Sequence, residues 1–120
     1  MPAAIKNLLI EQGATFVWTL VLKNGVGSAA PVLNLSGYSA RMHLRLEVAT
    51  PTTLAALSSA PGGGITITPL DGRLDIEITA QATSAMAFDK AVYDLELVQP
   101  DGRVLRIFKG SASLSLEVTR

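Results

Sequence analysis

Hydrophobic and polar residues alternate along much of the chain, and turn-forming residues stand where the alternation stops. Over residues 14–22 one phase is strongly apolar and the other mixes valine with threonine: Phe16, Trp18, Leu20 and Leu22 against Thr15, Val17, Thr19 and Val21. Because successive side chains of a β-strand point to opposite faces, this pattern predicts a strand that is largely apolar on both faces. Lys23-Asn24-Gly25 predicts the turn that ends it, since Asn and Gly tolerate positive φ angles.

The segment 39–48 alternates more cleanly and has one polar face. Its two phases are Ala40, Met42, Leu44, Leu46 and Val48 against Arg41, His43, Arg45 and Glu47. A sheet with one face on the core and one in water requires this arrangement. We therefore expect a strand over residues 39–48 whose apolar phase is buried.

Two further pairs of alternating segments predict β-hairpins. Residues 65–68 and 73–78 are joined by Leu70-Asp71-Gly72, and residues 93–97 and 104–108 are joined by Gln99-Pro100-Asp101-Gly102. Residues 111–118 predict a last strand that runs to the C-terminus, with an apolar phase of Ala112, Leu114, Leu116 and Val118. Residues 54–58 fit either a weak strand or a helical turn. The alanine-rich residues 79–88 predict one short helix, with Thr79 or Thr83 at its start.

The series of short strands and turns, without regular alternation of strand and helix, predicts the fold class. We expect one all-β domain over residues 1–120, an antiparallel β-sandwich (immunoglobulin-like or jelly-roll-like) of about seven to eight strands with one short helix; a small barrel is the alternative. A chain of 120 residues is long enough for one core and too short for two.

Composition adds an expectation about assembly. Hydrophobic residues make up 48% of the chain and the mean hydropathy is +0.36, although aromatic residues are only 5%. A domain of this size keeps much of its surface exposed, so we expect another subunit to cover part of the apolar surface. Ten basic and ten acidic residues cancel, which argues against a nucleic-acid or membrane partner because such partners are captured by a charged field.

The absence of cysteine excludes disulfides and thiolate metal sites and suits a reducing cytoplasm. Residues 1–6 lack the basic and apolar regions of a signal peptide. No apolar run reaches the roughly eighteen residues that a membrane-spanning helix needs, so we expect a soluble protein.

Candidate chemistry is sparse. His43, the single histidine, stands between two arginines, where a solvated surface role is favoured over metal binding. The pairs Asp75 with Glu77 and Asp94 with Glu96 have the spacing of a cation site or an acid and base, but arginines on neighbouring strands would also explain them. Gly62-Gly63-Gly64 lacks the Lys and Ser/Thr of a phosphate loop and predicts a flexible loop.

Three aromatic residues, Trp18, Tyr38 and Tyr93, have the composition of a sugar-stacking platform, although Trp18 and Tyr93 share phases with leucines and core burial is favoured for both. We expect no catalytic, cofactor-binding or metal-binding residue. The predicted core comprises Trp18, Leu20, Met42, Leu44, Ile76, Leu95 and Leu116.

The strands with two apolar faces predict an interface. Val17 and Val21 oppose the core phase of the first strand, and Val104 and Phe108 oppose Leu105 and Ile107 in a later one. The helix at 79–88 would cover such a patch within the chain; a partner subunit is the alternative that we favour. The predicted interface is therefore Val17, Val21, Val104 and Phe108, in a protein that self-associates or binds its neighbours.

Three phrases carry a family resemblance. They are Ile10-Glu11-Gln12-Gly13-Ala14-Thr15-Phe16, then Leu35-Ser36-Gly37-Tyr38-Ser39-Ala40-Arg41-Met42, and an ending with Tyr93-Asp94-Leu95-Glu96-Leu97, Pro100-Asp101-Gly102, Arg106, Gly110 and Glu117-Val118-Thr119-Arg120. In order and spacing they cover nearly the whole chain. They resemble small virion proteins of tailed bacteriophages, of the tail, baseplate and fibre-attachment type, including the β-sandwich N-terminal domain of upper baseplate proteins.

The resemblance implies a non-enzymatic structural protein of the virion, assembled in the host bacterial cytoplasm. Such a protein would be an oligomeric module that attaches or supports tail, baseplate or fibre components and contacts other virion proteins, without a cofactor. Capsid decoration or cementing is the alternative within that class, and a carbohydrate-binding β-sandwich module is the alternative outside it.

Overall fold

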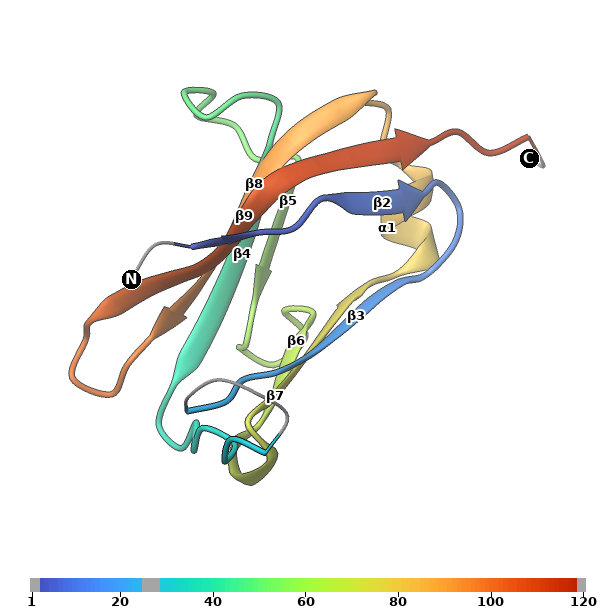
Figure 1. The fold of residues 1–120 in the computed structure, drawn as a ribbon. Coiled ribbons are helices and arrows are strands. Elements are labelled where there is room, and N and C mark those ends of the chain that lie inside the picture. The colour runs from blue at the N-terminus through green and yellow to red at the C-terminus, as the bar shows by residue number, and fades with distance from the viewer. Residues whose placement is uncertain (1–2, 25–28, 119–120) are drawn as a thin grey trace.

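The chain folds into two β-sheets that face each other across an apolar core, as a computed structural model describes for residues 3–24 and 29–118 (Figure 1). The large sheet has the order β1-β9-β8-β4-β5, and β2 also pairs with β9; the small sheet has the order β3-β7-β6. The strands of the large sheet are β1 (Ala4–Ile5), β2 (Leu8–Glu11), β4 (Ser39–Arg45), β5 (Ala55–Ser58), β8 (Lys90–Val98) and β9 (Val104–Ser115). Those of the small sheet are β3 (Phe16–Val21), β6 (Ile65–Thr68) and β7 (Arg73–Ile78).

This architecture confirms the predicted all-β, sandwich-like fold with one short helix; the described residues form nine strands rather than seven or eight. Three features of the sequence prediction fall partly outside these residues: Gly25 of the first turn, residues 1 and 2 of the N-terminus, and residues 119 and 120 of the last strand and of the ending phrase.

The predicted strand over residues 39–48 is confirmed as far as Arg45 and is wrong beyond it. Leu46 and Val48 are 51% and 86% exposed, although their phase predicted burial. The chain leaves the sheet here, because a turn closes between the Glu47 carbonyl and the Thr50 N–H at 3.0 Å. The Arg45 guanidinium donates to the carbonyl oxygen of Thr50 at 3.1 Å and fixes the bend.

The ambiguous segment 54–58 contains a strand, β5, which pairs with β4 and forms one edge of the large sheet. The predicted hairpin of β6 and β7 is confirmed, with a short 3-10 helix, η1 (Pro69–Asp71), in its turn. Gly72 ends that turn at φ 59°, a left-handed conformation that glycine adopts without strain.

The predicted helix is confirmed in shorter form as α1 (Ala80–Ser84). Thr79 is its N-cap and accepts a hydrogen bond from the Ala82 N–H at 3.2 Å. Thr83, the other candidate for this position, is fully buried instead. Its hydroxyl donates to the Ala14 carbonyl oxygen at 2.8 Å and accepts from the Gly13 N–H at 3.0 Å, so that it joins α1 to the turn between β2 and β3.

Residues 104–115 form one continuous strand, β9, whereas the sequence predicted two separate segments. Leu95 pairs with Phe108 but Glu96 pairs with Arg106, so Ile107 is an extra residue on β9. Such a β-bulge shifts the alternation by one position and makes one strand look like two in sequence. The predicted burial of Leu116 is wrong, and so is the predicted continuation of the strand through Val118: β9 ends at Ser115, and the two side chains are 68% and 93% exposed.

The sequence did not predict β1 and β2, which run parallel to β9. The two strands are separated by a kink at Lys6 and Asn7, where the Asn7 side chain replaces a backbone partner and accepts from the Ser111 N–H at 3.2 Å. The backbone of Lys6 comes so close to Gly110 of β9 that a Cβ atom there would overlap the Lys6 carbonyl group. Glycine at position 110 therefore permits this parallel pairing.

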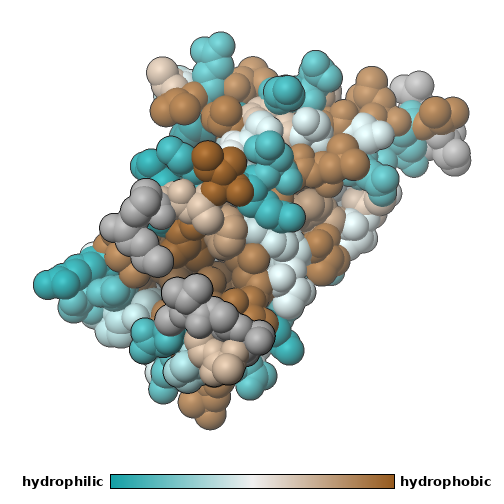
Figure 2. All heavy atoms as spheres, viewed as in Figure 1, coloured by the Kyte–Doolittle hydropathy of each residue, from teal (hydrophilic) through white to brown (hydrophobic). Residues whose placement is uncertain are grey.

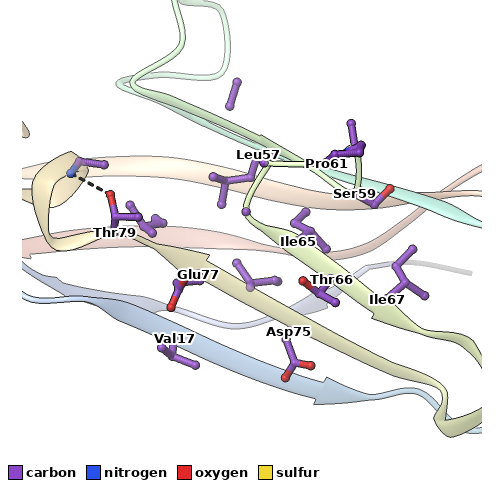
Figure 3. A pocket seen from close by; sticks show the side chains of 18 of the residues that line it. Val17, Leu57, Ser59, Pro61, Ile65, Thr66, Ile67, Asp75, Glu77 and Thr79 are labelled. Carbon is purple, nitrogen blue, oxygen red and sulfur yellow. Dashed lines mark hydrogen bonds between the residues drawn. The ribbon is translucent and has the colours of Figure 1, made fainter.

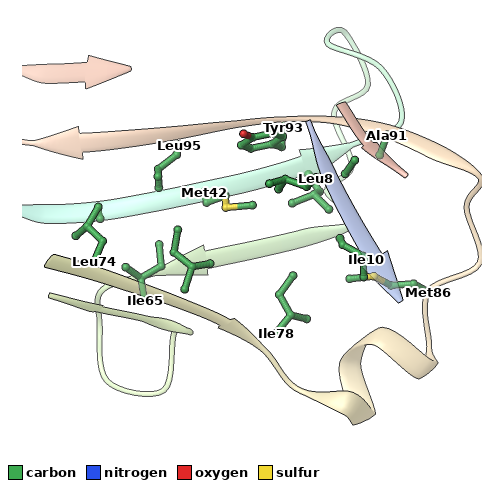
Figure 4. Close-up of a cluster of buried hydrophobic side chains, with 14 of the residues drawn as sticks. Leu8, Ile10, Met42, Ile65, Leu74, Ile78, Met86, Ala91, Tyr93 and Leu95 are labelled. Carbon is green, nitrogen blue, oxygen red and sulfur yellow. The ribbon is translucent and has the colours of Figure 1, made fainter. Parts of the chain in front are cut away.

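The core lies between the two sheets and is contiguous (Figure 4). Four of the residues predicted for it, Met42, Leu44, Ile76 and Leu95, have no exposed surface. Trp18 and Leu20 are partly buried and pack against this cluster. The fully or nearly buried members come from both sheets, from the connection before β4 and from the segment after α1, and include Leu8, Ile10, Leu35, Ile65, Leu74, Ile78, Met86, Phe88, Tyr93, Leu97 and Leu114.

Candidate interaction surface

The four residues of the predicted interface lie on three different surfaces. Val17 and Val21 project from the outer face of β3 and are 62% and 50% exposed. Val104 lies on the outer face of the large sheet, opposite Val98, and is 48% exposed. Phe108 points inward, where its ring meets that of Trp18 edge-on at a centroid distance of 5.3 Å. Val17 and Val21 therefore share one face of the small sheet, whereas Val104 lies on the outer face of the large sheet and Phe108 lies between the sheets.

The outer face of the small sheet carries a row of charges beside these valines. In the register of β3 and β7, Val17 stands opposite Glu77, and Thr19 opposite Asp75. The Asp75 carboxylate accepts from the Thr19 hydroxyl at 2.9 Å and from Arg73 Nε at 3.0 Å. Within the described chain, the side chain of Glu77 has no hydrogen bond or ion pair. The face therefore combines exposed apolar groups with one carboxylate that remains available to a partner.

A groove of about 990 Å³ runs along β6 and continues onto this face (Figure 3). We call it the β6 groove. Among residues 3–24 and 29–118, strand β6 pairs only with β7 and strand β5 only with β4, so both present an edge to the groove. A single parallel bridge between Ser58 and Gly64 joins the two edges at one end. Its lining includes Leu57 of β5 and Ile65, Thr66 and Ile67 of β6. From the outer face it includes Val17, Asp75 and Glu77.

The glycine loop at 62–64 closes one end of the β6 groove. Gly62 and Gly64 have φ angles of 77° and 93°, which residues other than glycine rarely adopt. The Gly63 carbonyl oxygen accepts from the Ser58 N–H at 2.8 Å, and the Gly64 carbonyl oxygen accepts from the Glu77 N–H at 2.8 Å. These bonds tie the loop to β5 and β7 and fix the width of the groove at this end.

Most charged side chains on the outer face of the large sheet are paired. Arg41 Nε lies 2.7 Å from a Glu96 oxygen, and Arg106 Nε lies 3.4 Å from an Asp94 oxygen. Arginines on neighbouring strands thus face these carboxylates, which is the structural interpretation that the sequence favoured. Asp75 and Glu77 lie on the other sheet, so the two carboxylate pairs do not meet.

His43 lies in a second hollow of about 500 Å³, on the outer face of the large sheet. Its Nδ1 is 3.3 Å from Arg45 Nη2, and Arg106 and Lys109 line the same hollow. In residues 3–24 and 29–118, no three His, Cys, Asp or Glu side chains gather closely enough to hold a metal ion.

The aromatic residues considered for sugar stacking contact the core. Trp18 meets Tyr93 edge-on at a centroid distance of 6.1 Å, and Tyr93 is only 4% exposed. Burial raises the pKa of Tyr93 to about 12. Tyr38 is partly buried and lines the β6 groove. These three rings do not form a platform on one open face.

Apolar side chains also gather in the middle of the face shown in Figure 2. Partly buried residues of β3 and β9 pack against the core, among them Leu20 and Leu105. The sequence predicted apolar excess on both strands. It did not predict the β6 groove, because a groove between two sheet edges depends on strand order; the only signal was the segment Ile65-Thr66-Ile67-Thr68 directly after three glycines.

No protein-family model matches the chain, and no curated protein matches it. Over the parts of the chain that the structure describes, no helix has the length and apolar character required to cross a membrane.

Proposed function

We propose that this protein is a non-enzymatic structural subunit of a tailed bacteriophage virion, a module that attaches or supports tail, baseplate or fibre components through protein-protein contacts. The observation that carries the proposal is the outer face of the small sheet, where Val17 and Val21 are 62% and 50% exposed beside the β6 groove. The resemblance of the three sequence phrases to small virion proteins supports the class of particle.

The physical reason is the free energy of burying apolar surface. Each Å² of apolar surface removed from water contributes about 25 cal/mol, so a patch of valines on a rigid strand drives association once the cost of orientation is met. A sheet edge adds to this, because the backbone groups of an edge strand are free to pair with another chain. Val17 and Val21 lie on β3, which is itself an edge of the small sheet.

The chemistry of the remaining surface agrees with a binding role. The carboxylates that the sequence singled out are paired with arginines or lie apart, and the aromatic rings pack inward. A capsid-decorating subunit would use the same kind of surface and differs only in its place in the particle.

The direct test is the composition of particles produced by the genome that encodes the chain. Peptide mass spectrometry of purified particles is expected to detect the protein, and the variant Val17→Asp/Val21→Asp is expected to fold but to be depleted from them. Antibody labelling of intact particles then separates the tail from the capsid surface. Absence of the wild-type chain from purified particles would overturn the proposal.

A further inference from the structure

The segment after β9 has the sequence of a strand but no strand partner in the described part of its own chain. Leu114, Leu116 and Val118 continue one phase of β9, with Ser115 and Glu117 in the other. The pairing of β9 with β2 ends at Ser115, which stands opposite Glu11. Beyond it, the Leu116 and Val118 side chains are 68% and 93% exposed.

The structure fixes the direction of this segment. The Glu117 N–H donates to Gln12 Oε1 at 2.9 Å, and Gln12 Nε2 donates to the Met86 carbonyl oxygen at 2.8 Å. Glu117 is therefore anchored to the turn after β2, and the segment projects away from the two sheets (Figure 1). The Leu116 and Val118 side chains of this anchored segment are therefore exposed rather than packed in the core.

The β6 groove has the complementary features. An edge strand directs the N–H and C=O groups of every second residue away from its sheet, where an added strand pairs with them. Ile65 and Ile67, two residues apart on β6, and Leu57 on β5 provide apolar contacts within the groove (Figure 3). Leu116 and Val118 have the same two-residue spacing, so an added strand places both on the apolar side and Glu117 on the outer side, beside Thr66.

We propose that residues 116–118 of one copy add as a strand to the β6 edge of a second copy. The inference rests on the proposed function and deepens it, because it names the partner as another copy of this chain. Backbone pairing with an edge strand gives affinity, and alternate side chains in the groove give specificity. The contact joins two different surfaces of the chain. Repetition of such a contact generates a ring if the rotation closes and a filament if it does not.

Disulfide trapping tests the contact, because the chain has no cysteine of its own. Glu117→Cys in one population and Thr66→Cys in another are mixed and oxidised mildly, and Glu117→Cys with Lys90→Cys is the matched control. Like Thr66, Lys90 is exposed, but it lies on the large sheet. Disulfide-linked dimers are expected from the first pair well above the yield of the control. Equal yields from the two pairs would overturn the proposal.

Sedimentation separates this proposal from the proposed function. Leu116→Asp/Val118→Asp changes only exposed side chains, so the variant is expected to keep the wild-type circular dichroism and to weaken self-association about tenfold or more. If the wild type self-associates and this variant does so equally, the added strand is wrong while an interaction role stands. If the wild type is a monomer throughout and is absent from particles, both proposals fail.

Discussion

The Tyr93 hydroxyl donates a hydrogen bond of 2.6 Å to the Lys6 carbonyl oxygen, 87 residues away in sequence. Tyr93 lies on β8 in the middle of the large sheet, and Lys6 lies in the kink between β1 and β2 at its edge. The bond spans β9 and satisfies a phenol that is otherwise surrounded by the core. It connects the N-terminal strands β1 and β2, which the sequence did not predict, to β8, which the alternation of apolar and polar residues did predict.

Tyr93→Phe is expected to lower the free energy of unfolding by about 1 kcal/mol, because the Lys6 carbonyl oxygen loses its donor while the ring keeps its packing. The measurement is urea unfolding followed by tryptophan fluorescence. An unchanged unfolding midpoint would show that water replaces the hydroxyl without cost.

The same residue predicts a dependence of stability on alkaline pH. Its pKa rises from 10.0 to about 12 on burial. The folded state therefore holds the proton more tightly than the unfolded state, and this contribution to stability is complete below pH 10 and is lost as the pH rises through about 12. Between these values the wild-type free energy of unfolding is expected to fall more steeply than that of Tyr93→Phe. Parallel curves for the two proteins would contradict the assignment.

Gly110→Ala tests the parallel pairing of the N-terminal strands. The added methyl group would overlap the Lys6 backbone, so β1 must shift, and we expect a loss of about 1–3 kcal/mol. Amide hydrogen exchange is expected to show reduced protection of the Lys6 N–H, which bonds to the Lys109 carbonyl oxygen at 2.9 Å. Ser113→Ala on the same strand is the control and is expected to change stability by less than about 0.5 kcal/mol. Equal stability of the two variants would show that β1 is not held at Gly110.

Leu44→Ala and Val48→Ala compare two residues of the same sequence phase. Leu44 has no exposed surface and Val48 is 86% exposed. The first substitution leaves a cavity and is expected to cost about 2–5 kcal/mol, whereas the second is expected to cost less than about 0.5 kcal/mol. Melting temperatures measured by calorimetry decide the matter. A similar loss in both variants would mean that β4 continues to Val48 with its apolar phase buried.

Leu44 and Val48 show which parts of the fold the sequence pattern predicts and which it does not. Alternation identifies β3, β4 and β8 because each buries one phase over several residues. It fails where a geometric feature interrupts the period: Ile107 shifts the phase of β9, and the turn at Glu47 releases Leu46 and Val48. The two-residue strand β1 is too short to show any period.

The candidate interaction surface was likewise predicted only in part. Alternation identifies Val17 and Val21 as the second apolar face of β3, and their exposure agrees with this. It does not reveal that Val104 lies on the other sheet or that Phe108 meets Trp18, because both depend on strand order and on the bulge. The β6 groove depends on the edges of two strands from different sheets, which no local pattern encodes.

Sedimentation velocity of the purified chain over a range of micromolar concentrations tests the central claim most directly, with Leu70→Asp as the matched control for Val17→Asp/Val21→Asp. Leu70 is 75% exposed on η1 and lies outside the β6 groove, so the control introduces the same kind of charge elsewhere on the surface. The wild type and Leu70→Asp are expected to self-associate as the concentration rises, and Val17→Asp/Val21→Asp is expected to stay folded and to associate more weakly. A compact wild-type monomer at every concentration, or an equal loss of association in Leu70→Asp, would contradict the claim that the outer face of the small sheet is an interface.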